Sequence, residues 1–442
     1  MVLKPPPKVE KLQAALRTKA KENPDYRFYA LYDKVHRADV LEYAYQRCRD
    51  NHGRAGVDDQ TFADIEAYGV ERWLGELALE LKSKTYQPQA VLRAWTTKED
   101  GSLRPLGVPT IRDRVVQTAV RIVLEPIFEP DMPSEQYAYR AERNAQDAVR
   151  EVQRLVDLGH VEVVDADLSG YFEAIPHSDL IQSVARRVSD RHILHLIKMW
   201  LVAPVDERDK RGRTQRTTRN RDQGRGVPQG APISPWLANL CMRRFILAWK
   251  RNGYEQRLEA RIVNYADDLV ICSRGHGVAA MAAMRQLMGR LQLPINERKT
   301  RLCRLPDERF TFLSYTYGRQ VSWRTGRPYL GPTPATKKVR AICRQISVTT
   351  RRQTLWRSPQ DEVRELNLQM RGWAQYFNLG YVTRAWQIVQ MHACRRLRRW
   401  LQRKHHSRTG HAQPYPHCVL YDEYGLTRLT HSVRRGSLWA KA

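Results

Sequence analysis

The chain has 442 residues, of which 75 are Lys or Arg and 47 are Asp or Glu, so its formal net charge is +28. This length suggests about two to four domains, and a hydrophobic content of 42% predicts a folded chain rather than a disordered one. There is no apolar run long enough for a membrane helix, no apolar core of a signal peptide and no CxxC pair. These features exclude secreted, membrane-spanning and disulfide-rich classes, so we expect a cytoplasmic protein without a membrane partner.

The positive charge is concentrated near the end of the chain. Residues 319–442 hold 24 Lys and Arg against five Asp and Glu, a net charge of +19. Neutralising the phosphates of a nucleic acid releases condensed counterions, so an excess of this size favours a nucleic-acid partner over a basic surface kept for solubility. A second basic cluster at 206–225 is predicted to be a surface loop or hairpin, and whether it contacts nucleic acid stays open.

The first predicted elements are an arm, a helical region and a pair of strands. Residues 1–28 are polar around three consecutive prolines and predict a mobile or loosely docked arm. A helical pattern follows from about 29 to 80, and two strands are predicted within 88–112 around the turn Glu99-Asp-Gly101. The next predicted elements are helix 117–128, strand 161–167, helices 178–187 and 192–201, loop 226–232, helix 234–250, strands within 261–272, helix 278–291 and strand 310–317.

The rest of the chain is predicted to be mostly helical, at 334–350, 360–377 and 382–404. The alternation of strands and helices, followed by helices alone, indicates a mixed catalytic body with a basic helical appendix.

Two adjacent carboxylates, Asp267 and Asp268, mark a predicted turn between apolar strand residues. Neighbouring anions repel each other, and a divalent cation is their natural counter-charge. Taken alone, this pattern also fits an ordinary acidic hairpin tip. A second apolar strand ends in Asp165 and Asp167, whose spacing puts both side chains on one face. Together the two segments predict a site for two metal ions, the arrangement used for in-line phosphoryl transfer.

These segments resemble the reverse transcriptases encoded by group II introns, which also act as maturases. Tyr265-Ala-Asp-Asp268 is similar to the family's YADD box, and Asp167-Leu-Ser-Gly-Tyr-Phe172 is similar to its first metal-binding motif. Six further blocks follow the family's order, at 53–58 (GRAGVD), 98–114, 226–239 (GVPQGAPISPWLAN), 296–300, 312–315 and 371–377 (RGWAQYF).

The resemblance implies an α+β fold, the right-hand polymerase. Its fingers and palm, the palm an antiparallel sheet with packed helices, would be followed by an all-α basic thumb or maturase (X) domain. We therefore predict four segments: an arm at 1–28, fingers and palm at 29–318, the thumb at 319–405, and a short basic C-terminal segment at 406–442. The end of the chain has no paired cysteines, so no endonuclease domain is expected.

The resemblance also implies the metal ligands. Asp167, Asp267 and Asp268 would be the catalytic residues and would bind two Mg²⁺ ions, with the Leu168 carbonyl as a further ligand and Mn²⁺ as a substitute metal.

Five residues are implied to bind the incoming dNTP. Lys98 and Arg104 would hold its triphosphate, Lys as a point charge and Arg as a planar fork. Phe172 would exclude a 2′-hydroxyl, and Gln229 would position the nucleotide. Lys299 would donate a proton to the leaving pyrophosphate. One departure from the family concerns a neighbouring block, 312–315, where Ser314 stands in place of the usual Gly.

The last predicted helix carries a basic face. Leu397, Trp400 and Leu401 would pack inward while the basic residues face a phosphate backbone. The predicted nucleic-acid-binding residues are Arg395, Arg396, Arg398, Arg399, Arg403 and Lys404. We expect most aromatic residues of this region to pack in its core rather than to stack on bases.

The sequence thus leads to one hypothesis and two alternatives. The hypothesis is an RNA-directed DNA polymerase and maturase that binds group II intron RNA, assists splicing, and copies RNA from a template–primer duplex into cDNA for retrohoming into target DNA. Its location would be the bacterial cytoplasm or nucleoid. One alternative is the same polymerase in a host role such as antiviral defence, DNA repair or CRISPR spacer acquisition. The other is an RNA-binding splicing factor with a vestigial polymerase site, against which the intact site residues argue. The oligomeric state, including dimerisation, is left open.

Overall fold

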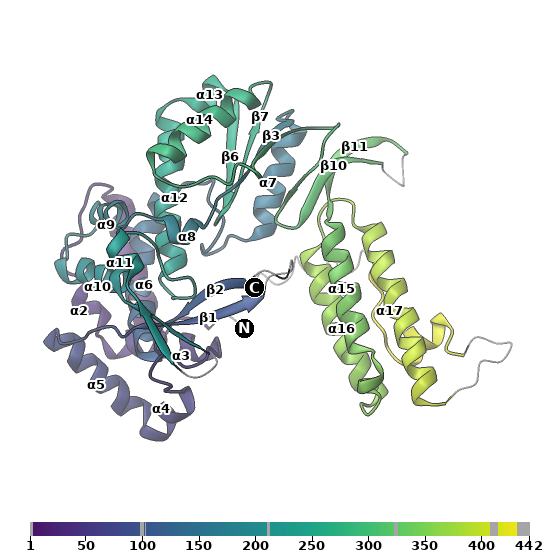
Figure 1. Cartoon of the computed structure of the whole chain (residues 1–442), viewed down its shortest axis with the longest axis horizontal. Helices are drawn as coiled ribbons and strands as arrows, with labels where there is room; N and C mark the ends of the chain where they lie inside the picture. Colours follow the sequence, from purple (N-terminus) through teal and green to yellow (C-terminus); the bar gives the residue numbers. More distant parts are fainter. Residues whose placement is uncertain are drawn as a thin grey trace.

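The computed structural model describes residues 3–97, 101, 103–209, 213–321, 326–406 and 414–430. Figure 1 shows a mostly helical N-terminal lobe, a central lobe built on a β-sheet, and a C-terminal domain of long helices. Helices combine with largely antiparallel sheets, which confirms the predicted α+β class. Lys98 lies outside the described residues, so its predicted role stays a prediction.

The N-terminal lobe packs around α6 (Ile111–Phe128), which is buried along most of its length. The side chain of Thr110 accepts a hydrogen bond from the Asp113 N–H and so starts this helix earlier than the predicted residue 117. The other helices of the lobe are α1 (Pro7–Glu22), α2 (Tyr32–Val35), α3 (Ala38–Asp50), α4 (Phe62–Tyr68) and α5 (Val70–Ser83).

The prediction of a mobile or loosely docked arm at 1–28 is wrong for α1. This helix packs against α6 and α3, and it buries Val9, Leu16 and Ala20. Pro7 occupies the first helical position, where its missing N–H would have no partner in any case. The prolines therefore precede an amphipathic helix whose apolar residues recur about one turn apart.

A four-stranded sheet with the order β2-β1-β4-β5 adjoins the N-terminal lobe. The predicted hairpin forms from β1 (Val91–Thr97) and β2 (Leu103–Val108), which are antiparallel. The basic cluster at 206–225 is confirmed as a hairpin, β4 (Val205–Arg208) and β5 (Thr214–Thr217), with the short helix α11 (Arg219–Gln223) after it.

The central lobe contains an antiparallel sheet with the order β6-β7-β3-β8. Adjacent residues of a strand point to opposite faces, so Val163 and Val164 of β3 join different apolar clusters. Helix α14, backed by α12, covers one face, and α7 covers the other. The elements are β3 (Glu162–Asp167), β6 (Ala260–Tyr265), β7 (Asp268–Ser273), β8 (Arg301–Arg304), α7 (Ala145–Asp157), α12 (Ser234–Arg251) and α14 (Gly277–Arg290).

Four shorter helices connect these units: α8 (Tyr171–Ala174), α9 (His177–Ala185), α10 (Arg191–Val202) and α13 (Tyr254–Arg257). None of the helices in the described ranges combines the length and apolarity that crossing a bilayer would need.

The predicted single strand at 310–317 is wrong, because two strands meet there in a tight turn. β9 (Phe310–Phe312) and β10 (Tyr315–Val321) pair through Phe312 and Tyr315. The two turn residues, Leu313 and Ser314, have φ angles of 47° and 68°. Two positive φ angles match the twist of a two-residue hairpin and explain why glycine would suit position 314.

The C-terminal domain begins later than predicted. Strand β10 crosses the predicted boundary at 318/319, and β11 (Pro328–Pro334) pairs with it, so an all-α domain from 319 is wrong at its start. The helices are α15 (Thr336–Thr349), α16 (Pro359–Tyr376) and α17 (Thr383–Lys404). They share an apolar core to which Leu420 and Leu426 of the C-terminal segment also belong.

The end of α16 joins the C-terminal domain to the central lobe. Phe377 is buried in the same cluster as Tyr315, and the Tyr376 hydroxyl donates to the Leu313 carbonyl at 3.0 Å. From α7, the Gln146 amide donates to the carbonyls of Gln375 and Tyr376. The block at 371–377 is therefore a structural joint, and Phe377 packs in a core as predicted.

Candidate active site

The two acidic segments are neighbours in the central sheet. Strands β3 and β7 are antiparallel, and Asp167 at the end of β3 pairs directly with Asp268 at the start of β7. Directly paired residues have Cβ atoms about 4.5–5.5 Å apart. Asp165, two residues before Asp167, shares its face of the sheet. The fold therefore gathers carboxylates from two distant parts of the chain at one end of the sheet.

The third predicted carboxylate lies in the turn between β6 and β7. Tyr265 pairs with Asp268, so only Ala266 and Asp267 connect the two strands. Ala266 has a φ angle of 57°, in the left-handed region, and Asp267 is exposed. The side-chain amide of Asn264 donates to the carbonyls of Ala266 at 2.9 Å and Asp268 at 3.3 Å. The turn thus holds Asp267 outward beside the Asp167–Asp268 pair.

Burial and neighbouring charges raise the pKa of two of these carboxylates, Asp165 and Asp268. Desolvation by the surrounding protein, together with the charges of Asp267, Asp165 and Asp167, raises the pKa of Asp268 to about 7, although the residue has an exposed surface. Desolvation, opposed by Arg301, raises the pKa of Asp165 to about 6. The negative charge at this end of the sheet is therefore only partly compensated by the protein.

Three basic residues face these carboxylates. The Lys299 Nζ lies 3.5 Å from an Asp167 carboxylate oxygen, and the Arg301 Nε lies 3.6 Å from Asp165. Arg104, exposed on β2, lies close enough for its charge to oppose the rise in the pKa of Asp268. The structure therefore brings two predicted dNTP-binding residues, Lys299 and Arg104, to the carboxylates.

The coordination shell of a metal ion at these carboxylates would have to be completed by other ligands. Within the described ranges, no three His, Cys, Asp or Glu side chains already form a group that could hold a metal ion. This agrees with the chemistry of Mg²⁺, which proteins usually bind through one or two carboxylates plus water and substrate phosphates. The backbone on both sides of Leu168 is hydrogen-bonded. The Asn296 N–H donates to the Asp167 carbonyl, and the Ser169 N–H donates to the Pro294 carbonyl.

The loop at 226–232 connects the carboxylates to the β1–β2 hairpin. The Val227 N–H donates to the Phe172 carbonyl at 2.8 Å, and the Gly107 N–H of β2 donates to the Gln229 carbonyl at 2.5 Å. Gly230 has a φ angle of 114°, and a Cβ there would lie 2.7 Å from the Gly107 oxygen. Only glycine therefore permits this close approach, through which the loop joins β2 at Gly107 to the backbone of Phe172.

A hollow of about 320 Å³ lies against this loop. Its walls come from both β-hairpins of the first sheet and from α11, and they include Arg93, Arg219 and Arg225 beside Gln229. The hollow thus combines positive charge with a position beside Gln229, and Glu173 is the acidic residue in its lining.

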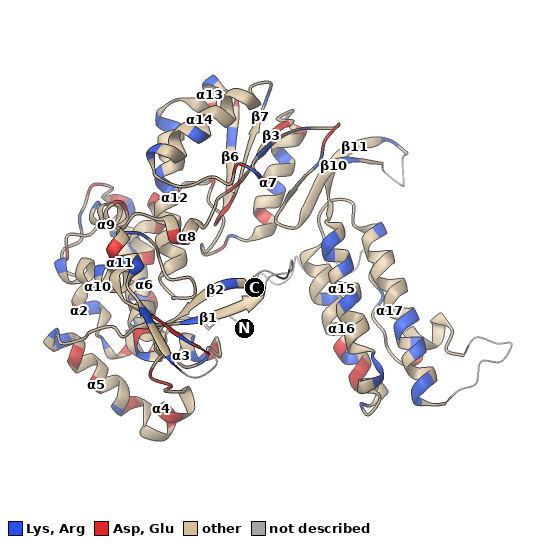
Figure 2. Cartoon of the chain, in the orientation of Figure 1, with Lys and Arg blue, Asp and Glu red and all other residues tan. Residues whose placement is uncertain are grey.

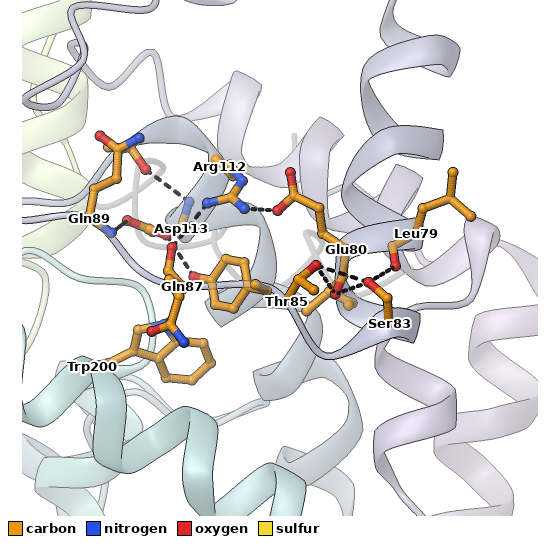
Figure 3. Close-up of polar contacts among 12 residues, drawn as sticks. Leu79, Glu80, Ser83, Thr85, Gln87, Gln89, Arg112, Asp113 and Trp200 are labelled. Atoms are coloured by element: carbon orange, nitrogen blue, oxygen red, sulfur yellow. Dashed lines mark hydrogen bonds and ion pairs between the residues drawn. The ribbon is translucent and has the colours of Figure 1, made fainter.

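The base of the β1–β2 hairpin is fixed by a polar network (Figure 3). The buried carboxylate of Asp113 accepts from the Gln89 N–H at 3.1 Å and from the Tyr86 hydroxyl at 2.6 Å. The Trp200 indole N–H donates to the same hydroxyl at 3.2 Å. Arg112 forms an ion pair with Glu80 and donates to the Gln87 carbonyl. These bonds tie the start of β1 to α5, α6 and α10, and so anchor the hairpin that carries Arg104.

The basic face of α17 divides into two sets. Arg395, Arg399 and Arg403 are exposed and recur every four residues, as predicted. The prediction that all six residues face outward is wrong for the others. Arg396 donates to Thr350 and to the carbonyls of Ser347 and Thr350, Arg398 donates to the Tyr415 carbonyl, and Lys404 donates to the Leu355 carbonyl.

Arg396, Arg398 and Lys404 thus donate hydrogen bonds to backbone carbonyls at the end of α15, just after it, and in the C-terminal segment. Helix ends leave carbonyls without partners inside the helix, and cationic side chains meet that need well. Figure 2 shows Lys and Arg along the helices of this domain, to one side of the central lobe.

Some residues of the site were not identified from sequence. The Thr300 hydroxyl accepts from the Asp167 N–H at 3.2 Å, Arg301 pairs with Asp165, and Asn264 supports the turn. Thr300 is the last residue of a block singled out in the sequence, Arg301 directly follows that block, and Asn264 directly precedes the YADD box. Proximity to these motifs was the available signal, but the side-chain partners depend on the fold.

Comparison with known proteins agrees with this geometry. Residues 96–331, just over half of the chain, match the family model "Reverse transcriptase (RNA-dependent DNA polymerase)". Residues 339–415 match the model "Group II intron, maturase-specific domain". The first match covers both carboxylate segments, and the second covers most of α15 to α17.

Curated relatives point the same way. The chain is 31% identical to protein YkfC of Escherichia coli K12 over 353 residues, which cover 71% of this chain and 89% of the relative. It is 32% identical over 238 residues to the group II intron-encoded protein LtrA of Lactococcus lactis, covering 52% of this chain and 37% of LtrA. The chain belongs to the reverse transcriptases, the RNA-dependent DNA polymerases, and among them to those that carry a group II intron maturase domain.

Proposed function

We propose that this reverse transcriptase copies RNA into DNA at Asp167, Asp267 and Asp268, which would hold two Mg²⁺ ions, or Mn²⁺ in their place. The pairing of Asp167 with Asp268, beside the turn that presents Asp267, carries the proposal. Carboxylate oxygens suit Mg²⁺, and the desolvation and crowded negative charge that raise the pKa of Asp268 favour a cation at this point. When bound, two metal ions stabilise the attacking and leaving oxygens of an in-line phosphoryl transfer.

The central lobe would then be the palm, the N-terminal lobe with its first sheet the fingers, and α15–α17 the thumb. In this assignment Arg104, on the fingers hairpin, and Lys98 hold the triphosphate of the dNTP, and Gln229 positions it. Phe172 lies under the sugar, and Lys299 delivers a proton to pyrophosphate. The anchored base of the hairpin and the bond between Gly107 and Gln229 support a fixed nucleotide site. The Leu168 carbonyl remains a proposed additional metal ligand.

A nucleic-acid duplex would extend from the carboxylates toward the basic surfaces. We assign the arginine-lined hollow next to Gln229 to the incoming template strand, because its positive charge suits phosphates. Arg395, Arg399 and Arg403 would hold the backbone of the primer–template duplex or of structured RNA.

The maturase-specific domain and the likeness to an intron-encoded protein support group II intron RNA as a partner. In this proposal the protein binds the intron RNA, assists its splicing, and makes the cDNA by which the intron enters target DNA.

Primer extension on an RNA template with a DNA primer tests the polymerase. We expect Mg²⁺-dependent extension with dNTPs but not NTPs, and its loss in Asp267→Asn. The RNA affinity of this variant, measured beside it, should equal that of the wild type. Extension that persists in Asp267→Asn would refute the assignment of the site. Splicing of the host intron that is unchanged when the protein is deleted would refute the maturase role.

A further inference from the structure

A single buried amide supports the turn that carries the YADD aspartates. Asn264 is 1% exposed and directly precedes Tyr265 on β6. Its Nδ2 donates to the Ala266 carbonyl at 2.9 Å and to the Asp268 carbonyl at 3.3 Å. The two bonds span the turn, so one side chain holds the backbone on both sides of Asp267.

This support matters because the turn has an unfavourable backbone conformation. Ala266 has a φ angle of 57°, a region that residues with a Cβ adopt rarely. A two-residue connection between paired strands requires positive φ in this part of the turn. Without the bonds from Asn264, Ala266 would gain freedom to leave this conformation, and the Asp267 side chain would turn with it.

Asn264 is itself fixed by neighbours from another segment. Its N–H donates to the Glu135 carbonyl at 2.9 Å, and its own carbonyl accepts from the Tyr137 N–H at 3.0 Å. Between these two, the buried Gln136 side chain donates to the Asn239 carbonyl of α12 at 2.9 Å. The Asn239 amide donates back to the Ala138 carbonyl at 2.7 Å.

The same helix, α12, also holds the segment that follows Asp167. The Tyr171 hydroxyl donates to the Ala238 carbonyl at 2.6 Å, one residue before Asn239. Both carboxylate segments are thus connected through buried hydrogen bonds to one turn of α12. Because these bonds do not involve the Asn264 side chain, loss of its amide would free only the Ala266–Asp268 turn to move relative to Asp167.

We propose that Asn264 is a positioning residue of the reverse transcriptase site, whose side-chain amide fixes the Ala266–Asp268 turn and so the placement of Asp267 and Asp268. The proposal rests on the function proposed above, because it assumes that the three aspartates act together. Groups that orient metal ligands from behind typically contribute 10–100-fold to metal affinity or activity.

The test compares Asn264→Ala with Ser273→Ala in the full chain. Ser273 is also fully buried, lies at the other end of β7, and forms side-chain bonds to the Leu258 carbonyl and the His276 N–H. Primer extension as a function of Mg²⁺ concentration is measured beside the melting temperature. We expect both variants to melt earlier. Only Asn264→Ala should need roughly 10–100-fold more Mg²⁺ or lose kcat by that factor.

A second substitution tests the turn directly. Glycine adopts positive φ without a Cβ penalty, so Ala266→Gly in the Asn264→Ala background should recover part of the lost activity. If Asn264→Ala does not fold, Asn264→Ser replaces it, because a serine hydroxyl has one hydrogen and cannot donate fully to both carbonyls.

The outcomes separate the two proposals. An Asn264→Ala enzyme that melts earlier but keeps the kcat and Mg²⁺ requirement of the wild type would overturn the positioning role, provided that Asp267→Asn is inactive in the same assay. An active Asp267→Asn enzyme would instead overturn the proposed function. A Ser273→Ala enzyme with the same Mg²⁺ shift as Asn264→Ala would show that any loss of hairpin stability suffices, and would also overturn the positioning role.

Discussion

The central lobe and the C-terminal helical domain differ in how closely their charged side chains are grouped and how far these side chains are neutralised. At the end of the central sheet, Asp167, Asp267 and Asp268 are brought together with incomplete neutralisation, and desolvation together with the neighbouring carboxylates raises the pKa of Asp268 to about 7. On α17, by contrast, the like charges are separated by helical spacing and half of them are paired with carbonyls. Concentrated charge suits the binding of a small multivalent cation, whereas dispersed charge suits a long polyanion.

The largest expected effect is on catalysis alone. Asp167→Asn removes one of the paired carboxylates and should lower the rate of primer extension by at least roughly 10²–10³-fold, the usual effect of losing one preorganised electrostatic group. Its RNA affinity should stay at the wild-type value, because α17 lies elsewhere. Single-turnover extension and filter binding check the two halves, and reduced RNA affinity would break the comparison.

Substitutions on the exposed face of α17 should have the opposite effect, because they should weaken RNA binding and leave the carboxylates intact. Replacing Arg395, Arg399 and Arg403 together by Gln should weaken RNA binding and reduce the slope of log affinity against log salt by about 2–3. The melting temperature should change little, since these side chains are exposed. A salt titration of RNA binding measures the slope, and an unchanged slope would mean that this face does not contact phosphates.

Neighbouring arginines on α17 sharpen the contrast further. Arg396→Ala should lower the free energy of unfolding of this domain by about 1.5–3 kcal/mol, because it removes charged hydrogen bonds to Thr350 and to two carbonyls. Arg395→Ala should leave stability nearly unchanged. Urea unfolding compares the pair, and equal losses in the two variants would contradict the division into exposed and structural sets.

The pH dependence of the metal-free protein follows from the raised pKa of Asp268. A folded-state pKa of about 7 lies above the ordinary value near 4. Protonation of Asp268 therefore stabilises the folded state fully below pH ~4, and this contribution is lost as pH rises through about 7. Asp268→Asn should therefore melt above the wild type at pH 8, with the difference shrinking toward pH 5. A difference that grows on acidification would contradict the shift.

Magnesium should reverse the order of the two melting temperatures at pH 8, so that the wild type melts above Asp268→Asn. Because binding to the folded state stabilises it, Mg²⁺ at pH 8 should raise the melting temperature of the wild type but not that of Asp268→Asn. The half-saturating Mg²⁺ concentration for the wild type should also rise as pH falls from 8 to 6, because a protonated carboxyl is a poor ligand.

The smallest expected effect is on stability, from a substitution in the turn between β9 and β10. Ser314→Gly should stabilise the protein by roughly 0.5–1 kcal/mol, because Ser314 has a φ angle of 68° that glycine adopts without strain. Thermal melts would detect it. Destabilisation would show that the Ser314 side chain has a partner worth more than the relieved strain.

Much of this could be predicted from the sequence. Short apolar stretches beside acidic residues located β3 and the β6–β7 hairpin, and three-to-four-residue spacing located α15 to α17 within a few residues of their observed ends. These patterns are local, since periodicity of 2 or 3.6 follows from the geometry of a single strand or helix. The helix α1 was missed because its preceding prolines resembled a linker.

The order of motifs along the chain was enough to identify the family, and it singled out the three aspartates as well as Arg104 and Lys299, which the fold brings near them. The tertiary structure alone decided which charged side chains lie close together, which stay exposed, and which are paired with other groups of the protein. The pairing of Asp167 with Asp268, the support of the turn by Asn264, and the separation of Arg395 from Arg396 all depend on atoms brought together from distant segments. A hydrogen bond is decided by distances of about 3 Å, and only the folded chain sets those distances.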